Sequence, residues 1–204
     1  MKCTALGKSR LTGFAGAARP QLAFAFALDT VAAAVAVDDV DVAVVTNDRP
    51  VATRVAAMGA RVVPDPDHGL NAAYRAGADT APAGLRIAGL QGDLPALRTA
   101  ELAAALAWCE GFPTAFVADG QRVGTTLYAA VDRRSFQPRF GGRSRRRHLE
   151  AGAQEAIFDE AGELAGLRRD VDTGDDLLAA ARLGLGPNSA AAMGRLQEDQ
   201  AELT

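Results

Sequence analysis

The stretch Leu85-Arg86-Ile87-Ala88-Gly89-Leu90, followed by Gln91-Gly92-Asp93-Leu94-Pro95, places an acidic residue where a buried strand should end. Its first part is mostly apolar, and Pro95 forces the chain out of a sheet because proline cannot donate a ladder hydrogen bond. In open α/β sheets, ligands collect at the carboxyl ends of the strands, which makes Asp93 a candidate metal ligand. Taken alone, Asp93 is explained more simply as a cap for the helix expected near Arg98.

On either side of this stretch, short apolar or β-branched runs alternate with helix-like segments. We predict further strands over residues 40–46, 61–63, 114–118 and 125–131, and helices over 22–37, 50–58, 70–78, 98–110 and 175–183. Strands that alternate with helices of this length indicate a mainly parallel sheet with helices on both faces. The predicted fold class is therefore α/β.

Length, net charge and the pattern of apolar residues exclude several classes of protein. A length of 204 residues predicts one domain over residues 1–204, and the formal charge of −3 offers no basic excess for nucleic acid or an anionic membrane. The longest apolar stretch is interrupted by Asp29 and Thr30, so no signal peptide or membrane span is predicted. We expect a cytoplasmic protein with a small substrate, whose oligomeric state the sequence leaves open.

A second acidic segment, Asp170-Val171-Asp172-Thr173, lies near the end of the chain. In an extended segment, the two aspartate side chains point to the same face about 6–7 Å apart, a span that suits chelation of a cation. The alternative is that Asp172 or Thr173 caps the following helix. Joined to Asp93, the pair offers three hard oxygen ligands of the kind that Mg²⁺ prefers.

Two further segments are cationic. Lys2, Lys8 and Arg10 lie in an N-terminal stretch with few strand or helix signals, where they could hold phosphates or simply form a frayed, basic terminus. Residues 132–147 concentrate arginine in an acidic protein. That segment is either a solvated loop and helix face or an anion clamp, because guanidinium groups match phosphate and carboxylate geometry.

Taken together, these segments resemble the 2-phospho-L-lactate/phosphoenolpyruvate guanylyltransferase family of coenzyme F420 biosynthesis. The resemblance covers essentially the whole chain, in order. It is carried by Lys2 with Lys8-Ser9-Arg10-Leu11, Gly69-Leu70-Asn71-Ala72-Ala73, Gln91-Gly92-Asp93-Leu94-Pro95-Ala96-Leu97, Phe116-Val117-Ala118-Asp119, Gly124-Thr125-Thr126, Pro138-Arg139-Phe140-Gly141 with Ser144 and Arg147-His148, and Arg169-Asp170-Val171-Asp172-Thr173.

The resemblance implies a Rossmann-like sheet of the GT-A, or nucleotide-diphospho-sugar transferase, type. It also implies transfer of GMP from GTP to the phosphate of a three-carbon acid, with release of pyrophosphate. The alanine- and arginine-rich composition suggests the actinobacterial branch, whose acceptor is phosphoenolpyruvate and whose product is enolpyruvoyl-2-diphospho-5′-guanosine. The product would pass to the next enzyme of the pathway.

The alternatives are 2-phospho-L-lactate or another three-carbon phospho-acid as acceptor, or a degenerate nucleotide-binding protein without activity. A molybdopterin or sugar-phosphate nucleotidyltransferase is a further alternative. The chain lacks the Gly-Gly-x-Ser-x-Arg type of N-terminal loop that such enzymes would bring.

The resemblance also implies roles for single residues. The family's acceptor-binding positions fall on Thr125, Gly141 and Ser144, and its Mg²⁺ ligands on Asp93, Asp170 and Asp172. Lys2 and Lys8 would bind the nucleotide, and Lys8 or Arg10 would screen the departing pyrophosphate. Asn71 is a candidate for reading the guanine or ribose, or else a helix cap. His148 is expected to be structural rather than a proton shuttle.

The chain departs from the family pattern in two places. The family's first apolar strand would precede Lys2, so we expect an N-terminally shortened sheet that lacks this strand. In addition, Val123-Gly124-Thr125-Thr126 lacks the first Gly-Thr of the usual repeat, and Gly142-Arg143 replaces a commoner Pro-Asp or Pro-Gly. Arg143 is thus placed to alter which acid is preferred.

Overall fold

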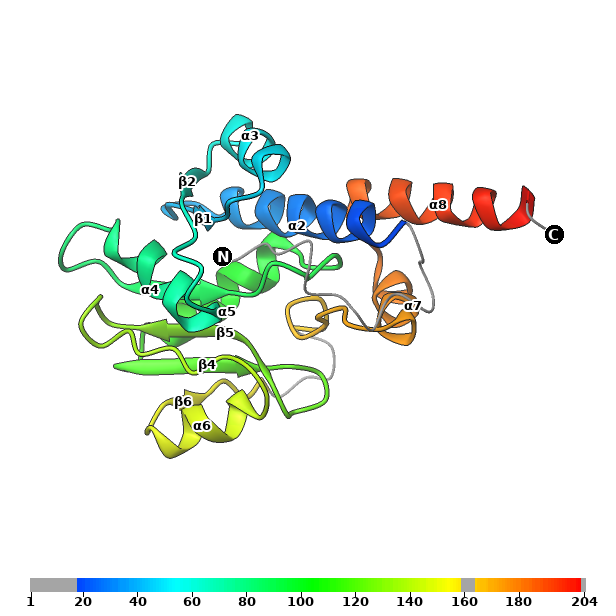
Figure 1. Cartoon of the computed structure of the whole chain (residues 1–204). Coiled ribbons are helices and arrows are strands. Elements are labelled where there is room, and N and C mark those ends of the chain that lie inside the picture. The colour runs from blue at the N-terminus through cyan, green and yellow to red at the C-terminus, as the bar shows by residue number, and fades with distance from the viewer. Residues whose placement is uncertain (1–17, 159–163, 203–204) are drawn as a thin grey trace.

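The computed structural model describes residues 18–158 and 164–202, with helices and strands that follow the predicted alternation (Figure 1). The predicted elements are found with boundaries close to those expected, and α6, β6 and α8 are additional. In chain order the elements are α2 (Arg19–Val35), β1 (Ala43–Val45), α3 (Arg49–Ala57), β2 (Arg61–Val63), α4 (Leu70–Asp79), β3 (Ile87–Leu90), α5 (Thr99–Cys109), β4 (Thr114–Ala118), β5 (Thr125–Ala130), α6 (Ser144–Glu150), β6 (Gln154–Glu155), α7 (Gly174–Leu183) and α8 (Pro187–Glu202).

The strands of the described residues form two sheets. β1 and β2 pair in parallel, and a four-stranded sheet has the order β3-β5-β4-β6. β4 and β6 are parallel, but β5 runs antiparallel to both β3 and β4. Only residues 119–124 connect β4 to β5, and a parallel pairing needs a crossover of about a dozen residues or more. The α/β class is confirmed, and the larger sheet is mixed rather than mainly parallel.

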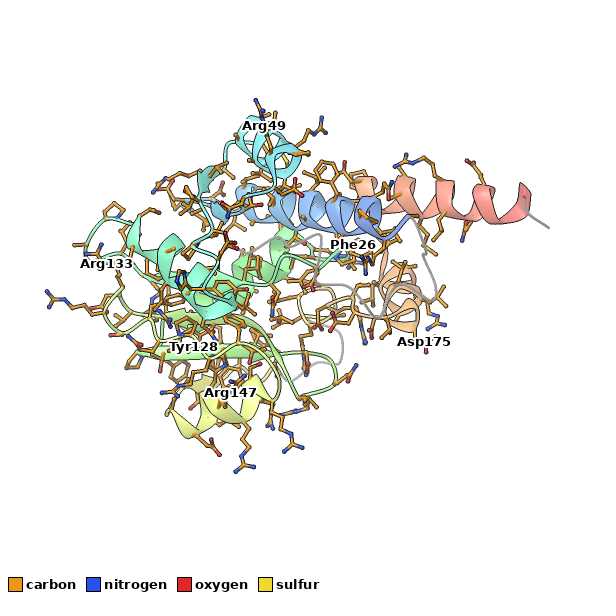
Figure 2. All side chains as sticks on the ribbon, in the orientation of Figure 1. Phe26, Arg49, Tyr128, Arg133, Arg147 and Asp175 are labelled. Carbon is orange, nitrogen blue, oxygen red and sulfur yellow. The ribbon has the colours of Figure 1, made fainter. Side chains whose placement is uncertain are left out.

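α2 and α8 pack against each other, and α8 extends beyond α2 toward the C-terminus (Figure 1). Phe26 of α2, labelled in Figure 2, is fully buried and packs in one cluster with Leu196 of α8. The carboxylate of Asp29 accepts hydrogen bonds from the backbone N–H groups of Asn188 (3.1 Å) and Ser189 (2.7 Å) at the start of α8. A negative charge is favourable there because unpaired N–H groups gather at a helix N-terminus.

The polar pair that interrupts the apolar stretch of α2 therefore anchors other segments. Next to Asp29, the buried hydroxyl of Thr30 accepts a hydrogen bond from the backbone N–H of Leu94 (3.0 Å). This bond holds the segment that follows β3 against α2.

No helix in the described residues combines the length and the hydropathy that crossing a lipid bilayer requires.

The 170–172 segment is held by its central residue. Val171 is fully buried in the same cluster as Phe26, and its backbone N–H donates to the backbone oxygen of Asp93 (3.1 Å). Because alternate residues of an extended segment face opposite ways, burial of Val171 turns Asp170 and Asp172 away from the core.

We expect Asp29→Asn to lower the free energy of unfolding by about 2 kcal/mol, because a buried amide cannot accept all of the hydrogen bonds that the carboxylate accepts. Urea unfolding followed by circular dichroism measures this change. The matched control is Asp38→Asn, since Asp38 is exposed and should tolerate the change. Equal unfolding midpoints for both variants would contradict this account of how α8 is anchored.

Candidate active site

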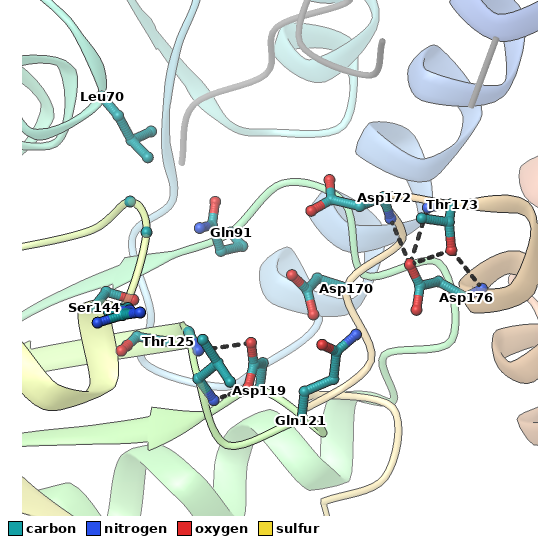
Figure 3. A pocket seen from close by; sticks show the side chains of 15 residues that line it. Leu70, Gln91, Asp119, Gln121, Thr125, Ser144, Asp170, Asp172, Thr173 and Asp176 are labelled. Carbon is teal, nitrogen blue, oxygen red and sulfur yellow. Dashed lines mark hydrogen bonds between the residues drawn. The ribbon is translucent and has the colours of Figure 1, made fainter. Parts of the chain in front are cut away.

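A cavity of about 520 Å³ lies between the ends of β3 and β5, the 141–144 segment and the 170–176 segment (Figure 3). It brings together five residues that were predicted from the sequence although they lie far apart along the chain. These are Thr125, Gly141, Ser144, Asp170 and Asp172. The predicted acceptor-binding and metal-binding groups thus share one cavity, except for Asp93, whose side chain does not line it.

The turn between β4 and β5 is held by Asp119. Its Oδ1 accepts a hydrogen bond from the backbone N–H of Val123 (2.8 Å), and its Oδ2 accepts one from Gly124 (2.7 Å). Position 124 has no room for a side chain, because a Cβ atom there would lie 2.5 Å from Asp119 Oδ2. The turn delivers Thr125 to the cavity. Asp119 lies at the end of a predicted strand, but the sequence prediction assigned it no role. Its position five residues before Gly124-Thr125 is the sequence feature that could have pointed to this turn contact.

Thr125 is bonded to a buried imidazole. Thr125 Oγ1 lies 3.0 Å from Nδ1 of His148, whose Nε2 accepts the backbone N–H of Arg139 (2.9 Å). Burial, followed by the charges of Arg147 and Arg139, lowers the pKa of His148 to about 4. The ring is therefore neutral at pH 7, in agreement with the structural role expected for it.

Asn71 is bonded to the 138–144 loop and is not the helix cap that was one of its two predicted roles, while its contact with the guanine or ribose stays a prediction. Its side-chain Nδ2 donates to the backbone oxygen of Phe140 (3.1 Å), and its Oδ1 accepts the backbone N–H of the same residue (2.8 Å). Both ends of the amide are thus engaged by the 138–144 loop. The cap position of α4 is occupied by Gly69, so Asn71 is not a helix cap. Asn71 instead positions the loop that carries Gly141.

The arginine-rich segment is mostly engaged with the protein itself. Arg145 and Arg146 bond to glutamate carboxylates, and Arg133 and Arg147 donate to backbone carbonyl oxygens. Figure 2 shows Arg147 beside α6 and Arg133 away from it, on the α4 side of the molecule. Arg143 lines the cavity, in a left-handed backbone conformation with φ +56°. Of the arginines in residues 132–147, Arg143 is the one that lines the cavity, so it is the residue that remains a candidate for binding an anion there.

The carboxylates of Asp170 and Asp172 both face the cavity (Figure 3). Asp93 is linked to this pair through the main chain, by its bond to Val171. Within residues 18–158 and 164–202, no three His, Cys, Asp or Glu side chains are grouped so that they could hold a metal ion, and Asp93 as a third ligand stays a prediction. The aspartate pair still fits Mg²⁺, which commonly binds one or two carboxylates and takes its other oxygens from water and substrate phosphates.

The helix-capping alternative for this segment is also correct in part. Thr173 Oγ1 accepts the backbone N–H of Asp176 (3.2 Å), and Asp176 Oδ2 accepts the backbone N–H of Thr173 (2.9 Å). This reciprocal capping box starts α7 and leaves Asp170 and Asp172 on the cavity side.

The predicted phosphate-binding residues Lys2, Lys8 and Arg10 lie outside the described residues.

We expect acidification from about pH 6.5 to pH 5 to lower the free energy of unfolding by about 2 kcal/mol through His148. The unfolded imidazole binds a proton below pH 6.5, whereas the native one does so only near pH 4, so stability is lost as the pH falls between these values. Urea unfolding at several pH values measures the slope. His148→Gln should flatten it, and equal slopes for the two proteins would contradict the prediction.

Comparison with known proteins gives consistent results. The model of the family described as "Guanylyl transferase CofC like" matches residues 1–190. A phosphoenolpyruvate guanylyltransferase of Thermomonospora curvata is 50% identical over 201 residues, which is 96% of this chain and 87% of that relative. One of Streptomyces scabiei is 48% identical over 207 residues, covering 96% of this chain and 94% of the relative.

The fold has a counterpart among solved structures. A crystal structure of a protein assigned as a nucleotide-diphospho-sugar transferase, from Desulfovibrio desulfuricans G20, aligns with a TM-score of 0.56 over 90% of this chain and 95% of that one. At 14% identity this likeness concerns the fold, and it confirms the predicted nucleotide-diphospho-sugar transferase type. From the family match and the identities above, the chain belongs to the CofC-like guanylyl transferase family.

Proposed function

We propose that this protein transfers GMP from GTP to the phosphate of phosphoenolpyruvate, with Mg²⁺, in coenzyme F420 biosynthesis. The products would be enolpyruvoyl-2-diphospho-5′-guanosine and pyrophosphate. The observation that carries the proposal is the single cavity in which Thr125, Gly141 and Ser144 face Asp170 and Asp172. The relatives' shared name, phosphoenolpyruvate guanylyltransferase, supports the choice of acceptor.

The chemistry needs positioning more than it needs a protein nucleophile. An oxygen of the acceptor phosphate attacks the α-phosphorus of GTP, and the bond from that phosphorus to the oxygen bridging to the β-phosphate breaks. Pyrophosphate leaves with the bonding electron pair. Because the attacking phosphate is already ionised at pH 7, no general base is required, and alignment of the two substrates supplies much of the acceleration.

Residues on one side of the cavity are suited to an anionic acceptor. The hydroxyl groups of Thr125 and Ser144 can donate to phosphate or carboxylate oxygens. Gly141, at φ +108°, adopts a backbone conformation that other residues rarely tolerate. Asn71 and Arg147 hold the backbone on either side of Gly141. The acceptor subsite is thus held by bonds from outside it.

The charge of the cavity supports a requirement for a divalent cation. Its lining includes the carboxylates of Asp119, Asp170, Asp172 and Asp176 and the guanidinium of Arg143. Such a lining would repel two phosphorylated substrates. Mg²⁺ held by Asp170 and Asp172 would neutralise phosphate charge and stabilise the charge that develops during transfer. Lys2, Lys8 and Arg10 would add positive charge for the nucleotide and the departing pyrophosphate.

We expect Asp170→Asn and Asp172→Asn each to lower kcat/KM by about 100-fold or more while keeping the unfolding midpoint, because each removes one negative oxygen ligand. The assay follows pyrophosphate release that depends on both GTP and acceptor, with and without EDTA. Asp175→Asn is the matched control, since Asp175 is exposed in the first turn of α7 and does not line the cavity. Full activity in EDTA would refute the role of Mg²⁺, and no release with phosphoenolpyruvate or 2-phospho-L-lactate would refute the function.

We expect Arg143→Ala to raise the KM for phosphoenolpyruvate about fivefold, with a smaller effect on the KM for GTP. An exposed guanidinium paired with a carboxylate contributes about 1 kcal/mol. The control is Arg146→Ala, because Arg146 pairs with Glu150 and does not line the cavity. Comparing both variants with 2-phospho-L-lactate tests whether Arg143 sets acceptor preference. Equal effects of the two substitutions would remove Arg143 from the acceptor site.

A further inference from the structure

The protonation state of His148 follows from its two hydrogen bonds. The backbone N–H of Arg139 can only donate, so the Nε2 atom that it contacts at 2.9 Å must be the unprotonated nitrogen. A neutral imidazole carries its one hydrogen on the other nitrogen. His148 therefore has its hydrogen on Nδ1 and donates it to Thr125 Oγ1, 3.0 Å away.

This donation determines what the Thr125 hydroxyl can do. Its oxygen accepts from His148, so its own hydrogen must point elsewhere. In the described part of the chain, the bond to His148 is the one hydrogen bond of this side chain. The side chain lines the cavity, beside Ser144 and the turn held by Asp119 (Figure 3). The hydrogen is thus available to an anion in the cavity.

The imidazole is held rigidly in this orientation. It is fully buried, stacks on Tyr128 with ring centroids 4.6 Å apart, and meets the edge of Phe140 at 5.6 Å. Its partner Arg139 precedes Phe140, whose backbone is bonded to Asn71. His148 therefore connects the two segments that carry the acceptor-binding positions, the start of β5 and the 138–144 loop.

We infer that His148 is a positioning residue: it fixes the Thr125 hydroxyl as a hydrogen-bond donor aimed at an anionic oxygen of the acceptor. The inference rests on the proposed function, because the acceptor is the phospho-acid named there. It assigns His148 no proton transfer and no contact with substrate. Without His148, the hydroxyl could rotate and present a lone pair, which would repel an anion.

Two substitutions separate the two bonds of the ring. Asparagine can place an amide N–H near the Nδ1 position and donate it to Thr125. Glutamine reaches the Nε2 position, where its amide oxygen can accept the backbone N–H of Arg139, but it cannot donate to Thr125. Each variant leaves one former partner unbonded, so they are matched for the loss of one buried hydrogen bond. His148→Gln should raise the KM for phosphoenolpyruvate roughly tenfold, His148→Asn should raise it much less, and the KM for GTP should stay constant in both.

A double-mutant cycle tests whether the effect passes through Thr125. Thr125→Val should itself raise the acceptor KM about tenfold or more, since a bond to a charged group is lost. Adding His148→Gln to Thr125→Val should then change the acceptor KM less than twofold, because the hydroxyl to be oriented is already gone. If His148→Gln has the same effect in both backgrounds, or if the two His148 variants behave alike, His148 is merely structural.

The hydrogen position can be measured without any change at His148. In the whole chain labelled with ¹⁵N-histidine, the NMR spectrum of the imidazole nitrogens shows signals from two histidines. The His68→Gln variant removes one set and so identifies the signals of His148. We expect the Nδ1–H form at pH 7, and the Nε2–H form would overturn the inference. A wild-type protein that releases no pyrophosphate refutes the proposed function and this inference together. An active wild type with an additive cycle refutes the inference alone.

Discussion

The short connection between β4 and β5 constrains the larger sheet and the cavity together. Residues 119–124 are too few for a parallel crossover, so β5 pairs antiparallel with β4. In the sheet, β5 lies between β4 and β3. The carboxylate of Asp119 closes this turn through the backbone of Val123 and Gly124. Because Gly124 leaves room for that carboxylate, the next residue, Thr125, begins β5 at the cavity wall.

Burial of a neighbour positions the other half of the cavity. Val171 lies in the core, and its backbone is bonded to that of Asp93 in the segment following β3. Asp170 and Asp172 are therefore presented to the cavity by a neighbour that is itself buried in the core. Under the proposed function, this acidic lining would repel phosphorylated substrates alone, and a divalent cation between carboxylate and phosphate would make binding favourable.

Several polar residues that attract functional interpretation hold the structure instead. Asp29 and Thr30, which break the apolar run of α2, anchor α8 and the segment after β3. Asn71 clamps the backbone of Phe140, and the arginines around α6 bond to carboxylates and carbonyls of the same chain. Asp29, Thr30 and Asn71 are buried or half-buried, and each is bonded within the protein because leaving it without a partner would cost stability.

The sequence by itself determined the positions of most helices and strands, the α/β class and the family, because hydrophobic periodicity, turn residues and motif order are local properties. It also placed Thr125, Gly141, Ser144, Asp170 and Asp172 at one site by resemblance. Only the tertiary structure decided the antiparallel direction of β5, the absence of Asp93 from the lining of the cavity, and the hydrogen-bond partners of Asn71 and His148. These depend on contacts between residues far apart in the chain, such as Asn71 with Phe140, which no local pattern encodes.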